Sequence, residues 1–151
     1  MIEDDLARRS LFRLVYASRF AGAERDFDEA LRSIIVKSIQ NNRMVDITGY
    51  LIAGQGRFLQ LLEGPEESVR ATYHRIGQDA RHGGFARISE GPTNRRLFRD
   101  WNMGQHRVGA EDRVLAKFGL NVFLPAQLNG DIALRLLAEA GGQHLRQPGL
   151  S

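Results

Sequence analysis

Alternating apolar and polar residues are clearest between residues 47 and 64, which read ITGYLIAGQGRFLQLLEG. Two short runs that suit β-strands, residues 47–53 and 57–62, flank a glycine-rich break, and this pattern predicts a β-hairpin. Period two places Phe58, Gln60 and Leu62 on one face of the second strand. Gln60 is therefore an amide between two large apolar neighbours. Because a buried amide without a partner costs roughly 1–3 kcal/mol, we expect a polar group to meet it.

A first strand and a first helix precede the hairpin. Residues 11–18 (LFRLVYAS) alternate, which places Tyr16 on an apolar face. Taken alone, Tyr16 is a core tyrosine whose hydroxyl bonds to the backbone. Asp26 and Glu29 resemble a capping box, which predicts a helix that runs to about residue 41. Asn42 follows in line with the apolar stripe of that helix, and taken alone it is a candidate C-cap.

A second helix and two further strands follow the hairpin. Pro65, with two glutamates after it, predicts a helix that ends near residue 78. Strands are predicted at residues 86–90 and 97–103, and the last one places Trp101 and Met103 on the same side. The order βαββαββ predicts an α+β, ferredoxin-like fold, which is a five-stranded mixed sheet with two helices on one face.

Beyond residue 104 the pattern turns helical, at residues 111–118 and 131–140. About 40 residues are too few for an independent domain. We therefore divide the chain into a domain at residues 1–105, which opens with a short polar leader, and a C-terminal helical extension at residues 106–151. The extension is expected to pack on the sheet or at an oligomer interface.

Composition narrows the classes of protein. The 151 residues, 42% hydrophobic and 26% charged, indicate one globular domain. The net charge is only +3, and the arginines at positions 95, 96 and 99 lack the aromatic or glycine pattern of a nucleic-acid surface, so we expect no nucleic-acid partner. Without a signal peptide or the ~18–20 apolar residues that span a bilayer, we expect a cytoplasmic protein that does not enter a membrane.

The sequence offers few residues for metal or covalent chemistry. It has no cysteine, and its four histidines, His74, His82, His106 and His144, form no pair with metal-ligand spacing, so we expect no metal. Motifs for a nucleophile elbow, a phosphate loop or a dinucleotide site are absent. An acylphosphatase-like hydrolase would suit the fold and would depend on Arg19. A protein-interaction module of the same fold that binds no cofactor is the other alternative.

Three neutral polar side chains can meet on one face of the sheet. Tyr16 and Gln60 can lie on neighbouring strands, and Asn42 at the end of the first helix can point towards them. A planar, apolar ligand with polar edges would fit between the two helices, with its edges bonded to Asn42, Gln60 and the loop at residues 79–82. These groups favour a flavin-like ring.

Five motifs at these residues resemble the BLUF family, the flavin-binding blue-light sensor domains. The resemblance implies a blue-light photoreceptor, not an enzyme, that binds FAD, or FMN in its place, without a covalent bond. It implies signalling to an effector protein or through a homo-oligomer, and the extension resembles that of short, single-domain members. The motifs are LVYAS around Tyr16, NNRMVDITG at 41–49, FLQLLEG at 58–64, QDARH at 78–82 and FRDWNMG at 98–104.

The resemblance also implies a role for each site residue. Tyr16 would donate an electron and a proton, Gln60 would bridge Tyr16 to the flavin, and Asn42 would hold the pyrimidine edge. Trp101 and Met103 would compete for a position beside Gln60 and carry the signal outward. Asn102 departs from the family pattern, in which a small residue is common there. The other implied pocket residues are Ile34, Ser38, Phe58, Leu62 and Ile76 around the ring, and Asn41, Asp79, Arg81 and His82 towards its O2 side or the ribityl chain.

Overall fold

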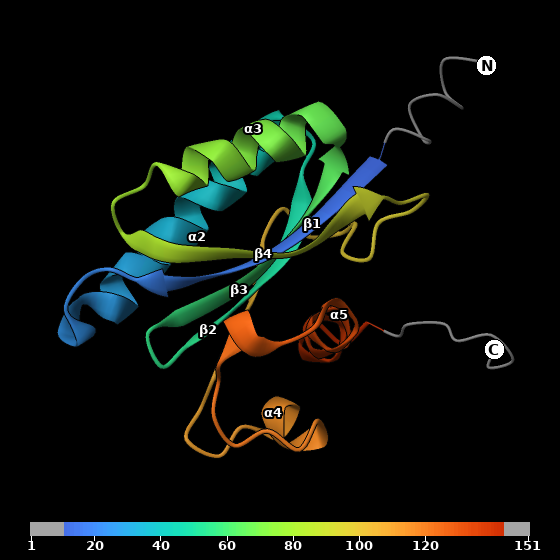
Figure 1. Ribbon diagram of the computed structural model, residues 1–151. Helices are drawn as coiled ribbons and strands as arrows, with labels where there is room; N and C mark the ends of the chain where they lie inside the picture. The colour runs from blue at the N-terminus through green and yellow to red at the C-terminus, as the bar shows by residue number, and fades with distance from the viewer. Residues whose placement is uncertain (1–10, 144–151) are drawn as a thin grey trace, which may run out of the picture.

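A computed structural model of the chain describes residues 11–143 (Figure 1). The polar leader at residues 1–9 and His144 lie outside the described residues. The strands are β1 (Leu11–Phe20), β2 (Thr48–Gly54), β3 (Arg57–Pro65), β4 (His82–Pro92) and β5 (Gly104–Arg107). The helices are α2 (Phe27–Met44), α3 (Glu66–Gly77), α4 (Arg113–Lys117) and α5 (Gly130–Ala140), with short 3₁₀ turns η1 (Glu24–Asp26) and η2 (Pro125–Gln127).

The five strands form one mixed sheet in the order β4-β1-β3-β2-β5. All neighbouring pairs are antiparallel except β2 and β5, which run parallel. Helices α2 and α3 cover one face, and α4 and α5 lie on the other side of the sheet (Figure 1). The predicted fold, a five-stranded mixed sheet with two helices on one face and a helical extension, is confirmed.

Two apolar clusters lie on opposite faces of the sheet, because successive side chains of a strand point to opposite faces. On β3, Phe58 and Leu62 join the cluster beneath α2 and α3. Leu59 and Leu61 of the same strand join the cluster that contains Leu136 of α5. Helix α5 therefore packs against the second apolar face of the sheet.

The ends of α2 differ from the prediction. Asp26 is the N-cap residue but its side chain makes no capping hydrogen bond, and the 3₁₀ turn η1 leads into the helix instead. The helix continues to Met44, so Asn42 lies within its last turn and is not its C-cap. The Asn42 carbonyl accepts hydrogen bonds from the backbone N–H groups of Val45 and Ile47.

The predicted strand at residues 97–103 is wrong. These residues form a loop, and β5 begins at Gly104. The buried carboxylate of Glu63 accepts hydrogen bonds from the backbone N–H groups of Leu97, at 2.8 and 2.9 Å, and Phe98, at 2.9 Å. Backbone groups that are bound to a side chain are not available to a strand ladder. Strand β4 is also longer than predicted, since it starts at His82 and passes through an irregularity opposite Ser18.

Candidate functional site: a cavity between two helices

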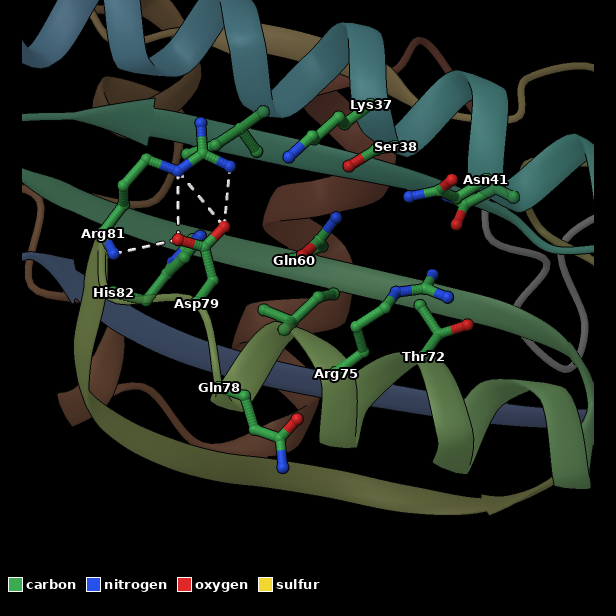
Figure 2. Close-up of a pocket in the computed structure, with 13 residues that line it drawn as sticks. Lys37, Ser38, Asn41, Gln60, Thr72, Arg75, Gln78, Asp79, Arg81 and His82 are labelled. Atoms are coloured by element: carbon green, nitrogen blue, oxygen red, sulfur yellow. Dashed lines mark hydrogen bonds and ion pairs between the residues drawn. The ribbon is translucent and has the colours of Figure 1, made fainter.

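A cavity of about 450 Å³ lies between α2 and α3, above the centre of β3 (Figure 2). Gln60 projects into it from the sheet, while the side chains of the two helices form its walls (Figure 2). The turn after α3 contributes the remaining wall. The lining residues are Ile34, Lys37, Ser38, Asn41 and Asn42 of α2, Gln60 of β3, Thr72, Arg75 and Ile76 of α3, and Gln78, Asp79, Arg81 and His82.

Most of the predicted pocket residues line this cavity, and four do not. Tyr16, Phe58, Leu62 and Met103 are buried in the adjoining core. Arg19, on which a hydrolase would depend, does not line the cavity.

The prediction missed Lys37, Thr72, Arg75 and Gln78, which also line the cavity. Helical spacing could have revealed two of them. Lys37 precedes Asn41 by four residues, and Thr72 precedes Ile76 by four, so each shares a helix face with a predicted residue.

Tyr16 and Gln60 are direct partners across the antiparallel pair β1–β3. The Tyr16 hydroxyl donates to Gln60 Oε1. On its other side, the Gln60 Nε2 group donates to the sulfur of Met103, at 3.4 Å. A thioether is a weak acceptor. The buried amide is therefore held strongly at its oxygen and weakly at its nitrogen.

Tyr16 is fully buried, and its ring lies 5.0 Å from the ring of Tyr73, centroid to centroid. Burial is the main cause that raises the pKa of the Tyr16 hydroxyl far above its usual value, and the nearby Tyr73 and Asp79 raise it further. Tyr16 therefore keeps its proton in the resting protein. The acceptor bonded to that proton is Gln60 Oε1.

One end of the cavity is fixed by an ion pair. Arg81 donates to both carboxylate oxygens of Asp79 (Figure 2). It also donates, at 3.1 Å, to the hydroxyl of Ser33 on α2. The hydrogen bond from Arg81 is the main cause that lowers the pKa of Asp79 to about 2. Burial lowers the pKa of the neighbouring His82 to about 4, so its ring is neutral near pH 7.

Asn42 connects the cavity to the loop before β5. Its Nδ2 group donates to the carbonyl of Asn102 at 2.9 Å, and Asn102 Nδ2 donates to the carbonyl of Ile47 at 3.1 Å. Asn102, the departure from the family pattern, thus helps to hold this loop against the end of α2.

Trp101 and Met103 do not lie on the same side, contrary to the prediction. Met103 is 5% exposed and packs in the cluster beneath α2 and α3. Trp101 is 39% exposed, and its ring lies 5.5 Å from that of Tyr50 and 6.2 Å from that of Phe98. Because the segment is a loop and not a strand, its side chains do not follow period two. Met103 is therefore the one of the two that lies beside Gln60.

The second face is connected to this loop through Tyr50 of β2. Its hydroxyl lies 3.0 Å from the carbonyl oxygens of both Gln105 in β5 and Ala140 at the end of α5. The single hydroxyl proton is shared between these two acceptors. Tyr50 thereby joins β5 to the extension.

In the part of the chain that the structure describes, three or more histidine, aspartate or glutamate side chains nowhere gather as they would around a metal ion. Within the same residues, no helix has the length and apolar character needed to cross a bilayer.

The fold and the cavity define a class, that of small α+β domains with a cavity between two helices above a buried tyrosine–glutamine pair. The sequence model of the BLUF family, described as sensors of blue-light using FAD, matches residues 11–104. This match covers more than half of the chain, and the chain belongs to the BLUF family.

Known proteins of two kinds are similar to this chain. The β subunit of photoactivated adenylate cyclase from Euglena longa is 28% identical over 94 residues, which are 62% of this chain and 11% of that protein. The blue light- and temperature-regulated antirepressor BluF of Escherichia coli (strain K12) is 44% identical over 75 residues, which are 48% of this chain and 17% of that protein. The chain therefore matches only a small part of either relative.

Solved structures match over a larger share of the chain. The ground state of BlsA has a TM-score of 0.79 and 25% identity, and the match covers 93% of this chain and 94% of BlsA. The dark state of BlrB, a BLUF protein, has a TM-score of 0.71 and 25% identity, and the match covers 88% of this chain and 96% of BlrB.

Proposed function

We propose that this chain is a blue-light photoreceptor in which FAD, or FMN in its place, is held without a covalent bond between α2 and α3. The observation that carries the proposal is the chain of hydrogen bonds from Tyr16 through Gln60 to Met103 at the floor of the cavity. A buried amide with one strong and one weak partner can exchange partners at low cost.

The cavity lining suits a flavin ring. Its volume of about 450 Å³ falls within the range of small-molecule sites, roughly 300–1,000 Å³. Ile34 and Ile76, from opposite helices, provide apolar contacts for a planar ring. The amides of Asn41, Asn42 and Gln60 provide uncharged donors and acceptors for its edges.

Two cations suit the phosphate-bearing tail that FAD and FMN share. Lys37 on α2 and Arg75 on α3 are exposed and line the same cavity. Among residues 11–143, no carboxylate lies within ion-pair distance of either side chain. Charge-assisted hydrogen bonds to phosphate are strong, and we propose that these two residues bind the tail.

The protein supplies the proton path. A flavin held by Asn42 and Gln60 would supply the absorption of blue light and an acceptor for one electron. Tyr16 is the buried donor next to Gln60, and its raised pKa means that it gives up its proton together with the electron. Gln60 Oε1 would receive that proton while Gln60 Nε2 releases one to the group that has taken the electron, so the amide stays neutral as its imidic-acid tautomer. Return of the electron and of a proton to Tyr16 would leave Gln60 turned or in the other tautomer, with its bond to Met103 exchanged for one at the cavity.

The release of Met103 would reach the second face of the sheet. Met103 and Trp101 belong to one loop, and Trp101 packs against Tyr50. Because the Tyr50 hydroxyl lies between β5 and α5, a displacement of the loop would change how α5 is held. We propose residues 1–105 as the photosensory domain and the extension at 106–151 as its output element.

The output itself is proposed to be protein association and not catalysis by this chain. The relatives named as an adenylate cyclase subunit and as an antirepressor match this chain over only 11% and 17% of their length, so the light-sensing segment is a small part of each. By analogy, we propose that this chain acts in the cytoplasm on a separate effector protein, or through a second copy of itself.

Absorption spectroscopy of the purified full chain tests the proposal. We expect a flavin spectrum that shifts reversibly to the red under blue light. Gln60→Leu should retain flavin but lose the shift, while His74→Gln, an exposed residue outside the cavity lining, should keep it. A colourless protein, or a spectrum unchanged by light in the wild type, would reject the photoreceptor; an unchanged shift in Gln60→Leu would reject the role of Gln60.

A further inference from the structure

Two arginines face each other on the sheet surface away from the flavin cavity. Arg19 of β1 and Arg57 of β3 are direct partners in the antiparallel register. Direct partners share a face, with Cβ atoms about 4.5–5.5 Å apart, and like charges in these positions destabilise the pair. The arrangement therefore costs free energy unless something neutralises the two charges.

No acidic side chain neutralises these two arginines within the described part of the chain. Neither arginine lies within ion-pair distance of a carboxylate among residues 11–143, and Arg57 bonds only to the carbonyl of Gln55, at 3.1 Å. Other arginines of the same sheet are paired: Arg13 on β1 contacts Glu63, and Arg87 on β4 contacts Glu90. Arg19 and Arg57 are thus an exception in this sheet.

The backbone next to Arg19 leaves room for its guanidinium. The pairing of β1 with β4 is irregular between Ala17 and Arg19, and Gly84 on β4 has a φ of +58°. A Cβ atom on Gly84 would lie 2.7 Å from Arg19 Nε, so a side chain there would collide with the arginine. β-Bulges are common beside functional sites, where they redirect a side chain.

The two arginines share a cavity with the extension. It has a volume of about 200 Å³ and is lined by β1, β3 and Gly84 on the sheet side and by the segment Leu124 to Gln127 on the other. A water molecule occupies about 30 Å³ in the liquid, so this space can hold one tetrahedral anion and a few waters. Gln127, also in the lining, carries an amide that can donate a further hydrogen bond.

We propose that Arg19 and Arg57 form a binding site for a phosphate group, either free phosphate or the end of a small phosphate ester. Two guanidiniums offer forked donors from two strands, which suits a tetrahedral oxyanion. A phosphate carries a charge of about −1.5 to −2 near pH 7, which balances two arginines, whereas a carboxylate balances one. The bound group would hold the segment before α5 against the end of the sheet. This site is separate from the flavin cavity and does not depend on it.

Titration of the full chain with inorganic phosphate, at constant ionic strength and followed by NMR of the arginine Nε–H groups, tests the site. We expect the Arg19 and Arg57 signals to move and saturate with one common Kd. Arg19→Gln or Arg57→Gln should weaken that Kd about tenfold or more, as expected from the loss of a charged hydrogen-bond donor. Arg32→Gln, on the exposed side of α2, should leave the Kd unchanged.

A second readout separates a binding site from a structural role. Without phosphate, Arg19→Gln should raise the Tm, because it removes the repulsion, and added phosphate should raise the Tm of the wild type only. Tighter binding of ribose 5-phosphate than of phosphate would assign the site to an ester, and equal or weaker binding to the free anion. The proposal would be overturned if the arginine signals never saturate with phosphate, or if they still saturate in both Arg19→Gln and Arg57→Gln.

Discussion

Tyr16 and Gln60 satisfy each other in a core that offers them few other partners. Removal of either side chain leaves a buried polar atom of the other unpaired, which costs about 1–3 kcal/mol. Tyr16→Phe and Gln60→Leu should each destabilise the fold by that amount. The double variant Tyr16→Phe/Gln60→Leu should lose less stability than the sum of the two single losses, because both partners are then apolar.

Urea unfolding of the four proteins, measured with flavin removed so that cofactor affinity does not enter, gives the coupling energy. We expect a coupling of about 1–2 kcal/mol. Strictly additive losses would mean that the hydroxyl and the amide do not depend on each other in the folded protein.

The sequence predicts these two residues well and others of the cavity poorly. Period two places each of them on an apolar face of its strand, so that they can meet if the strands are neighbours, and the observed register makes them direct partners. Arg75 is different, because a cation on an exposed helix face looks the same whether it faces open solvent or a cavity mouth. Its position becomes informative only once the placement of α3 beside α2 is known.

At the scale of elements, the loop at residues 97–103 depends on one buried carboxylate. Glu63 has no exposed side-chain surface and accepts from Arg13 as well as from the two backbone N–H groups of the loop. Glu63→Gln replaces one acceptor oxygen by an NH₂ group that would face donors. We expect a loss of about 3 kcal/mol in the free energy of unfolding and faster amide hydrogen exchange over residues 97–103.

Glu66→Gln is the matched control, because Glu66 is exposed and its ion pair with Arg70 lies on the helix surface. It should change stability by less than about 1 kcal/mol. Equal effects of the two substitutions, or unchanged exchange in the loop of Glu63→Gln, would show that Glu63 does not anchor this segment.

The same carboxylate explains why this element could not be predicted. Residues 97–103 have the alternation of a strand, but a hydrogen bond from Leu97 to a side chain 34 residues earlier is invisible to a local pattern. The hairpin, by contrast, is set by neighbouring residues and turns at the predicted glycines. Local patterns thus predict local elements, whereas distant side chains decide where a strand fails.

At the scale of the whole molecule, one sheet separates the cavity from the second apolar cluster. The face under α2 and α3 holds the cavity, and the face under α5 holds the apolar cluster shared with the extension. Sequence alone left open whether the extension packs on the sheet or in an oligomer, because an apolar helix stripe does not identify what covers it. In the single chain, α5 and the sheet share one apolar cluster.

The stability of the whole fold should depend on pH through His82. Its pKa falls from 6.5 in the unfolded chain to about 4 in the folded protein because its ring is buried, so below pH 6.5 the unfolded chain binds a proton that the folded protein does not. The contribution of His82 to stability is therefore fully present above about pH 6.5 and is lost as the pH falls towards 4. The linkage between proton binding and folding gives a loss of about 2 kcal/mol in the free energy of unfolding between pH 7 and pH 5.

Urea unfolding at these two pH values checks the size of the His82 effect. Between pH 7 and pH 5, the free energy of unfolding of His82→Gln should fall by about 2 kcal/mol less than that of the wild type. The control His74→Gln, which changes an exposed residue, should lose as much free energy of unfolding as the wild type. Asp79, whose pKa is lowered to about 2, contributes stability that is lost only below about pH 4, outside this window. If His82→Gln and the wild type respond equally, His82 binds its proton as readily in the folded protein as in the unfolded chain, and burial does not lower its pKa.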